Sequence, residues 1–329
     1  MTAPSTPAPT KDRSSYFGVI NRLSKASVDK HWEAYADIPW DDPDYQIDPD
    51  DPRWTLSPFL DPLARTDWYA SQPEHIQARI GLWRTATAMK VGLQFENLLK
   101  RGLLNYAYWL PNGRPEFRYV LHETTEECHH AMMFQEFVNR TKMPIRGMPR
   151  ALTVIAQSAP WIPLISTELF FVFVLGGEDP IDYVQRRTLK EGYAKHPLQK
   201  KIMQIHIAEE ARHISFARHF LRHRVPRLSP LRRGFLSVMT PIVLGAMARI
   251  MLCPPGPMVR YFNIPPEVVK EAYRHPDFRA ELRNCIAKTR ELAHELGLIN
   301  PVSKRVWQAL GIWDAPAGRT AARRAAQAA

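Results

Sequence analysis

The sequence predicts an all-α protein in which four long helices surround a dinuclear metal site, with additional helices on the C-terminal side. Three observations lead to this prediction. Helix-type spacing of apolar residues dominates from Glu74 onward, no clear run of alternating apolar residues indicates a sheet, and one short motif, acid-Glu-x-x-His, occurs twice. The two copies are Glu126-Glu127-Cys128-His129-His130 and Glu209-Glu210-Ala211-Arg212-His213.

The helices can be placed in order from the breaks between them. We expect the four long helices over about 73–110, 115–141, 151–175 and 197–224. Proline is tolerated near the starts, and Pro111-Asn112-Gly113 is a turn signal after the first. Glycine and proline disfavour helix interiors, so Gly176-Gly177-Glu178-Asp179-Pro180 is expected to end the third, with a shorter helix following to about Tyr193. Further helices are expected over about 16–35, 228–252, 267–273, 276–296 and 301–310.

Domain organisation follows from shifts in composition along the chain. We expect a single helical domain over residues 16–312, with its core at about 73–252. Residues 1–15 are rich in Thr, Pro and Ala and lack the apolar run of a signal peptide, so they are predicted to form a disordered arm. Residues 16–70 are rich in Asp, Pro and Trp, and the part after the helix expected over 16–35 is predicted to wrap over the domain. Residues 313–329 are predicted to form a low-complexity basic tail.

Composition limits the classes of protein and partner. The chain has 329 residues, 45% of them hydrophobic, which predicts a globular protein. Its three cysteines show no pairing pattern, which argues against a disulfide framework and predicts a cytoplasmic location. The net charge is +11 and is partly concentrated in the segment Arg222–Arg233. No nucleic-acid-binding motif is present, so no nucleic acid partner is expected, while peripheral contact with an acidic membrane stays open.

Two apolar segments are long enough to be considered as membrane spans, 151–175 and 235–252. The first is interrupted by Pro160 and carries Glu168, and the second carries Arg249. A charged group at the centre of a lipid-exposed helix is costly. We therefore interpret both segments as buried helices of a large bundle.

The strongest candidates for metal ligands lie in the second copy of the motif and one turn before it. His206, Glu210 and His213 stand at i, i+4 and i+7, so they project from one face of a helix. In the first copy, Glu127 and His130 share a helix face in the same way. Imidazole and carboxylate ligands together suit iron.

The other half of such a site is a single glutamate from each of two further helices. Glu96 in the first long helix and Glu168 in the third are the candidates, because each lies among apolar neighbours. A carboxylate is costly to bury there unless it is paired or bound to a metal. Together with Glu127 and Glu210, they provide four carboxylates, whose charge balances two divalent ions.

The case for a dinuclear site depends on the joint occurrence of these pieces. A single Glu-x-x-His is common on surface helices, and a buried glutamate can be satisfied by an arginine. Here two motifs stand about 80 residues apart, and each is preceded by a helix with a candidate buried glutamate. The acids that lead the motifs, Glu126 and Glu209, either hydrogen-bond a ligand histidine or face solvent.

The order of these candidates resembles the ligand pattern of the aminobenzoate N-oxygenase family, the AurF-type dinuclear iron enzymes. The matching residues are Glu96, Glu127 with His130, Glu168, and His206 with Glu210 and His213. His206 is the discriminating position, since ferritins, ribonucleotide reductase small subunits and acyl-carrier-protein desaturases usually lack it. The resemblance covers about residues 25–225 and implies a ferritin-like bundle, two iron ions held by these seven residues, and a homodimer.

The resemblance also implies an activity. The protein is then a non-heme di-iron monooxygenase that activates O2 and oxidises an amine nitrogen to a hydroxylamine and then to a nitro group, with the seven ligands as its catalytic residues. No flavin or nicotinamide motif is visible in the sequence. Electrons are therefore expected from an external donor, either an electron-donor protein or a small reductant.

The expected substrate pocket departs from that of family members that oxidise aminobenzoates. The relevant stretches read Ala88-Met89-Lys90-Val91 and Leu169-Phe170-Phe171-Val172, in which only Lys90 can pair with an acid. An apolar lining favours a hydrophobic substrate, so C–H hydroxylation or desaturation of an acyl or other lipid-like compound is the main alternative to N-oxygenation. A non-enzymatic iron-binding or storage protein and a metal-dependent hydrolase are further alternatives.

Overall fold

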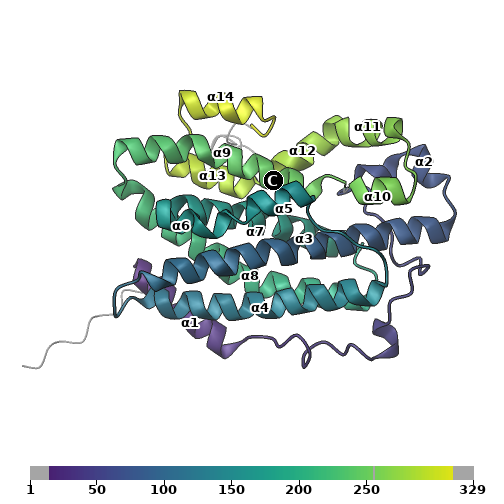
Figure 1. Ribbon diagram of the computed structural model, residues 1–329, viewed down its shortest axis with the longest axis horizontal. Helices are drawn as coiled ribbons and strands as arrows, with labels where there is room; N and C mark the ends of the chain where they lie inside the picture. The colour runs from purple at the N-terminus through teal and green to yellow at the C-terminus, as the bar shows by residue number, and fades with distance from the viewer. Residues whose placement is uncertain (1–14, 255, 314–329) are drawn as a thin grey trace, which may run out of the picture.

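The computed structural model describes residues 15–254 and 256–313, and every regular element in this part of the chain is a helix (Figure 1). The predicted all-α, ferritin-like fold is confirmed. Its bundle consists of α3 (Glu74–Tyr108), α4 (Pro115–Thr141), α7 (Thr167–Lys190) and α8 (Pro197–Arg224). The predicted arm over 1–15 and tail over 313–329 lie outside the described residues, apart from Ser15 and Trp313. The predicted domain boundaries stay predictions.

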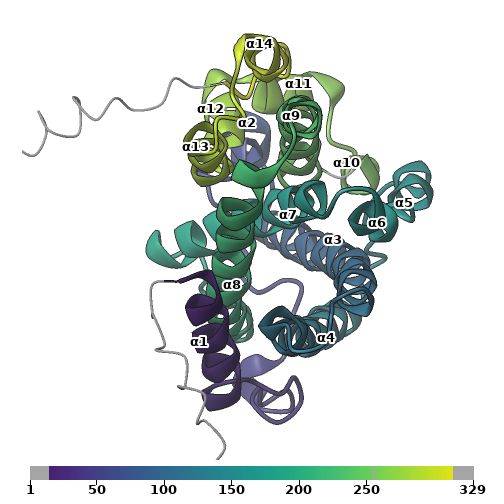
Figure 2. The ribbon, with the colours of Figure 1, turned by 90° about the vertical axis from the view of Figure 1, so that its left-hand side faces the viewer.

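The four bundle helices pack in pairs. α3 packs along α4 and α7 along α8, and α7 also packs against α9 (Pro230–Leu252), as the end-on view in Figure 2 shows. Pro115 and Pro197 occupy the first turns of α4 and α8, where the missing N–H costs no helical hydrogen bond. The observed bounds of α3, α4 and α8 closely match the predicted ones.

The third long helix differs from its prediction. In place of one helix over 151–175, the chain forms α5 (Arg150–Ala156), a 3-10 turn at Ala159–Trp161, α6 (Ile162–Ile165) and then α7. The predicted stop at 176–180 was wrong, because these residues lie in the middle of α7 with Pro180 inside the helix. Residues 169–180 are all buried, and this burial outweighs the poor helix propensity of glycine and proline.

Two glycines let α3 and α7 approach each other closely. A Cβ atom at Gly177 would overlap the ring of Phe95, and one at Gly102 would overlap the ring of Phe170. Gly177 therefore stands where no side chain fits. Its place in the sequence reflects the packing of two helices rather than the end of one.

Replacing Gly177 with alanine is expected to destabilise the protein by about 1–3 kcal/mol, because the added methyl group displaces the Phe95 ring in a packed core. Urea unfolding measures the effect. Gly234→Ala is the matched control, since Gly234 is helical and, beyond the adjacent backbone of its own helix, no atom lies within 4 Å of an added Cβ. That variant should gain up to about 1 kcal/mol. Equal losses in both variants would contradict the packing explanation, and adding Phe95→Leu to Gly177→Ala should recover part of the loss.

The N-terminal segment wraps the bundle, as predicted. α1 (Tyr16–Asp29) lies against α4 and α8. The chain then runs along the lower side of the molecule in Figure 1 through two short 3-10 turns, Pro43–Tyr45 and Pro62–Arg65, to α2 (Asp67–Ala70). Trp54 anchors this wrap. Its side chain is 2% exposed and stacks on His196 of the α8 N-terminus, with 4.2 Å between ring centroids.

His196 caps α8 as a neutral imidazole, and this makes part of the stability pH-dependent. Its Nδ1 accepts from the Leu198 N–H at 3.3 Å, and its Nε2 donates to the Gln46 carbonyl at 3.1 Å. Burial lowers the pKa of His196, so the folded protein binds this proton less readily than the unfolded chain does. The resulting stability is fully present above about pH 6.5 and is lost as the pH falls below that value.

His196→Asn keeps an acceptor at the cap but does not titrate. We therefore expect the wild type to lose more stability than this variant between about pH 7 and about pH 5. Loss of the stacking on Trp54 lowers the stability of the variant by the same amount at both pH values, so it does not affect this comparison. Urea midpoints of both proteins at the two pH values measure the difference. Parallel pH profiles would show that His196 is protonated equally in both states.

The C-terminal helices stack on the α7 side of the bundle. α14 (Pro301–Ala309) packs on α9, which in turn packs on α7 (Figure 1). Between them lie α10 (Gly256–Tyr261), α11 (Pro266–Arg274), α12 (Pro276–Asn284) and α13 (Ala287–Glu295). The helix predicted over 276–296 is thus two helices. In the part of the chain that the structure describes, the segment Pro230–Tyr261, which contains α9 and α10, is apolar and long enough to cross a membrane by length and composition, and half of its apolar window is buried inside the molecule.

Candidate metal centre

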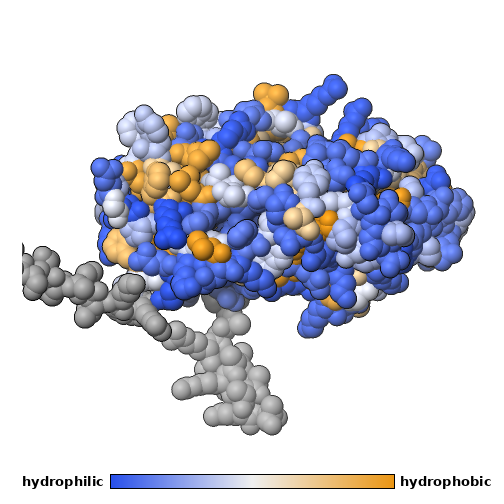
Figure 3. Space-filling view, turned by 90° about the horizontal axis from the view of Figure 1, so that it is seen from below, coloured by the Kyte–Doolittle hydropathy of each residue, from blue (hydrophilic) through white to orange (hydrophobic). Residues whose placement is uncertain are grey.

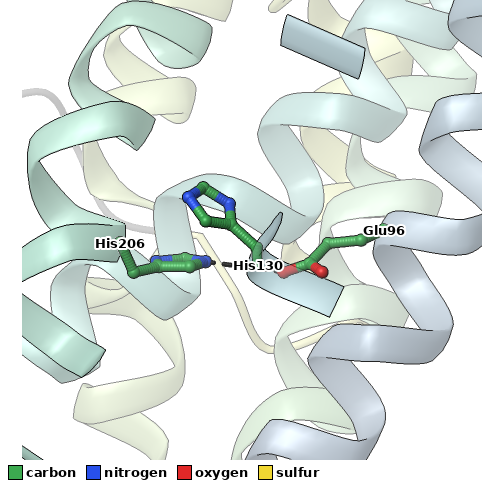
Figure 4. A group of neighbouring side chains, drawn as sticks. All are labelled: Glu96, His130 and His206. Atoms are coloured by element: carbon green, nitrogen blue, oxygen red, sulfur yellow. Dashed lines mark ion pairs between the residues drawn. The ribbon is translucent and has the colours of Figure 1, made fainter. Parts of the chain in front are cut away.

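Six of the seven predicted ligands converge in the middle of the bundle. They form two groups, and within each group the potential ligand atoms lie within 4.8 Å of one another. All six side chains are buried. Figure 4 shows the first group, with side chains from α3, α4 and α8. The groups are Glu96, His130 and His206, and Glu127, Glu210 and His213.

Two carboxylates connect these groups. Glu127 lies 3.4 Å from Nδ1 of His130 and 3.0 Å from Nδ1 of His213. Glu210 Oε1 lies 3.3 Å from both of these nitrogens and 3.5 Å from Nε2 of His206. Carboxylates that reach the ligands of both groups can bridge two metal ions in the core of a four-helix bundle.

The ligand atoms themselves indicate that cations belong here. Both carboxylate oxygens of Glu127 and Glu210, and Nδ1 of His130 and His213, are buried with no hydrogen-bond partner among the described residues. A buried polar atom without a partner costs about 1–3 kcal/mol, so a cluster of them is rare. Metal coordination would satisfy them together, and the mixture of imidazole and carboxylate suits a transition metal.

The first acid of each motif contacts the outer nitrogen of a ligand histidine, and in each case the histidine belongs to the other motif. Glu126 on α4 lies 2.8 Å from Nε2 of His213 on α8, and Glu209 on α8 lies 2.8 Å from Nε2 of His130 on α4. Arg212 joins the two acids, at 2.9 Å from Glu126 and 3.4 Å from Glu209. The predicted hydrogen bonds to histidine are present, and they leave Nδ1 of each ring directed at the cluster.

The structure does not bring Glu168 to this cluster. Glu168 lies in the first turn of α7, where Arg224 pairs with its carboxylate at 3.1 Å. Its predicted place beside the other six residues was wrong. An apolar neighbourhood in the sequence indicated a buried acid, but the burial is compensated by an arginine from the end of α8 rather than by a metal.

Glu178 lies where the sequence analysis expected Glu168. It comes ten residues later on α7, about 15 Å further along the helix axis, and is 2% exposed. Burial and the neighbouring Glu210 carboxylate raise the pKa of Glu178 well above its usual range. The sequence contained a signal for it, an acid at helical spacing from buried residues, but Gly176, Gly177 and Pro180 led to the prediction that the helix ends there. With Glu178 as the fourth carboxylate, the charge balance for two divalent ions is kept.

A second buried acid was also missed. Glu123 stands one turn before Glu127 on α4, is fully buried, and neither of its carboxylate oxygens has a hydrogen-bond partner among the described residues. Burial raises the pKa of Glu123 to about 8, so it is mostly protonated at neutral pH. Continuing the helix face of Glu127 by one turn toward the N-terminus would have found it.

Protons and metal ions compete for the cluster. Burial and the nearby Glu127 raise the pKa of Glu96. Burial opposes a charge on His130, but the surrounding Glu127, Glu209 and Glu210 outweigh it and raise its pKa well above the usual range. Since a ligand must give up its proton to bind a metal, loading the cluster releases protons.

Comparison with known proteins assigns the chain to a family. The family model described as P-aminobenzoate N-oxygenase AurF matches residues 13–297. Two relatives, the uncharacterized proteins Rv0885 of Mycobacterium tuberculosis and Mb0909 of Mycobacterium bovis, are each 44% identical to this chain over 301 residues, which covers 90% of this chain and 87% of the relative. No solved structure matches the chain. The match over most of the chain, together with the helical bundle and its two ligand groups, shows that this protein belongs to the AurF p-aminobenzoate N-oxygenase family of helical di-iron oxygenases.

Proposed function

We propose that this protein is a non-heme di-iron monooxygenase that uses O2 to oxidise an amine nitrogen of a hydrophobic substrate. The observation that carries the proposal is the buried pair of ligand groups joined by Glu127 and Glu210. Membership of the AurF family supports iron as the metal and nitrogen as the atom oxidised.

The chain's own residues prepare the site for this chemistry. When bound, two iron ions would supply the redox centre that O2 activation requires. Glu96, Glu127, Glu178 and Glu210 would offset their charge. Glu126 fixes the orientation of His213, and Glu209 that of His130, through the Nε2 contacts described above. These contacts keep Nδ1 of both rings available.

An inner cavity offers a place for the reacting part of the substrate. It has a volume of about 120 Å³, and its lining includes Met89, Phe134 and Val184. The ring centroid of Phe134 lies 5.1 Å from that of His206, so the cavity adjoins the ligand cluster. These apolar side chains suit a hydrophobic substrate.

One polar group in the inner cavity supports an amine as the group oxidised. Gln185 lines it, and its Oε1 is buried with no hydrogen-bond partner among the described residues. This oxygen can accept a hydrogen bond from a substrate N–H. Lys90, the basic residue that the sequence suggested for substrate binding, donates to Gln135 at 2.6 Å. The apolar part of the lining favours a second candidate, C–H hydroxylation or desaturation of an acyl compound.

We propose that the protein is a homodimer in the cytoplasm and receives electrons from an external donor. A homodimer fits the exposed apolar side chains Leu104, Phe117 and Leu121 at the α3–α4 end, and Figure 3 shows hydrophobic residues gathered toward the left, where Figure 1 draws that end. We further propose a cytoplasmic location and an electron-donor protein or small reductant. Membrane contact through 222–233 has less support, because Arg222 pairs with Glu295 and Arg233 donates to the Leu296 carbonyl, each at 2.7 Å.

The experiment that tests the function begins with anaerobic loading of ferrous iron and removal of unbound iron. Iron per chain is counted, O2 is added, and visible absorbance and oxygen consumption are followed with amine and fatty-acid substrates. Two irons per chain, a transient absorbance change and a hydroxylamine product are the expected result. Iron uptake without oxygen consumption, in a cage of many subunits by light scattering, would support storage instead, and turnover without O2 would support a hydrolase.

A further inference from the structure

We propose that the substrate site takes an anionic amphiphile, whose apolar part reaches the ligand cluster and whose negative head is held by arginines at an outer mouth. This inference names the substrate class of the oxygenase proposed above and rests on it for the reaction. The binding itself depends only on the cavities and their charges.

A second, larger cavity continues outward from the inner one. Its volume is about 1110 Å³, slightly above the usual range for small-molecule sites and far larger than a single aromatic ring needs. Arg84, Ala88, Ile181 and Met251 line both cavities, so the two adjoin through these side chains. A substrate that fills both is therefore elongated.

The outer cavity is strongly positive. Its lining includes five arginines and no acidic residue, namely Arg84, Arg146, Arg150, Arg249 and Arg260. This positive charge would add nothing to the affinity for an uncharged apolar ligand, and it would repel a cationic one. Guanidinium groups bind carboxylates and phosphates through charge-assisted, often bidentate hydrogen bonds.

Three of these arginines are free to bind an anion. Arg84 is held by Asp61 at 2.5 Å, and Arg249 donates to the Leu310 carbonyl at 2.6 Å. Arg146, Arg150 and Arg260 are exposed, and none of them makes an ion pair with another described residue. The unpaired charges therefore lie at the solvent side of the cavity, where a substrate head would stay hydrated while its chain is buried.

The rest of the outer lining is largely apolar. Val91, Met148, Leu152 and Ile250 contribute to it, and Val154, at the α5 rim, is 73% exposed. Each CH2 group buried against this wall adds to the affinity, so a chain of several carbons binds more tightly than a short one. The site thus has a charged mouth, an apolar wall and an inner end beside the ligand cluster. This combination matches an amphiphile rather than a compact, uniformly polar molecule.

Binding of simple amphiphiles to the protein after anaerobic incubation with ferrous iron, measured by calorimetry without O2 and with bound iron counted, tests the proposal. The probes are decanoate, decyl phosphate, decanol and decyltrimethylammonium, which share a chain and differ in the head. We expect both anions to bind more tightly than decanol, and the cation to bind most weakly. The tighter of the two anions identifies the head as carboxylate or phosphate.

Two variants and one control variant locate the binding. Arg146→Gln with Arg150→Gln should weaken decanoate binding roughly tenfold and leave decanol unchanged. Arg101→Gln with Arg118→Gln removes the same charge from exposed positions outside both cavities and should change neither. Ala88→Phe should block the passage and weaken decanoate and decanol alike, without changing iron content.

Equal affinity for the anion and the cation, no binding of either anion, or equal effects of the two arginine pairs would overturn the proposal. These outcomes are separable from failure of the oxygenase assignment. A protein that binds decanoate at the arginines but takes up no iron refutes the proposed function alone. A protein that binds two irons and consumes O2 but ignores the head group refutes the substrate class alone.

Discussion

Glu178→Gln is expected to reduce bound iron from about two ions per chain to about one, while Glu168→Gln leaves iron binding unchanged. The physical reason is position on α7. Glu178 is buried beside Glu210, whereas Glu168 pairs with Arg224 in the first turn of the helix. Glutamine preserves the size of each side chain and removes its charge. Iron per chain, measured after anaerobic loading, decides between the two positions.

Stability of the metal-free protein provides the control for this pair. Glu178 is a buried acid whose ionisation is opposed by burial and by Glu210, so its replacement by glutamine should not lower the free energy of unfolding. Glu168→Gln removes an ion pair with a half-exposed arginine and should cost no more than about 1 kcal/mol. Loss of iron in Glu168→Gln with full iron in Glu178→Gln would reverse the assignment.

Glu127→Ala or His213→Ala is expected to lose at least one iron per chain and all oxygen reactivity, with helical content unchanged. Glu127 contacts histidines of both ligand groups, so its removal affects both sites at once. His213 contacts both shared carboxylates. Iron counting, stopped-flow absorbance after mixing with O2, and far-ultraviolet circular dichroism measure the three expected results.

His219→Ala is the matched control for His213→Ala. Both histidines lie on α8, but His219 binds the Ser215 carbonyl at 2.8 Å within its own helix and is outside the ligand groups. It should keep two irons and normal reaction with O2. Full iron occupancy in both Glu127→Ala and His213→Ala would contradict the assignment of these residues as ligands.

The sequence by itself determined the helical fold and most of the candidate site. Helical periodicity places residues at i, i+3, i+4 and i+7 on one face, so His206, Glu210 and His213 had to point the same way. The same holds for Glu127 and His130. Proline and turn signals marked the ends of α3, α4 and α8, because backbone sterics act locally and can be read from neighbouring residues.

Tertiary structure alone decided what depends on packing between helices. Gly177 and Pro180 disfavour a helix locally, yet α7 continues through them, because burial against α3, α8 and α9 supplies more free energy than their propensity removes. The choice of Glu178 over Glu168 follows from that continuation. The crosswise hold of Glu126 and Glu209 on histidines of the opposite helix depends on the register between α4 and α8. Periodicity specifies which residues share a face of one helix, but it carries no information on the sliding of one helix past another.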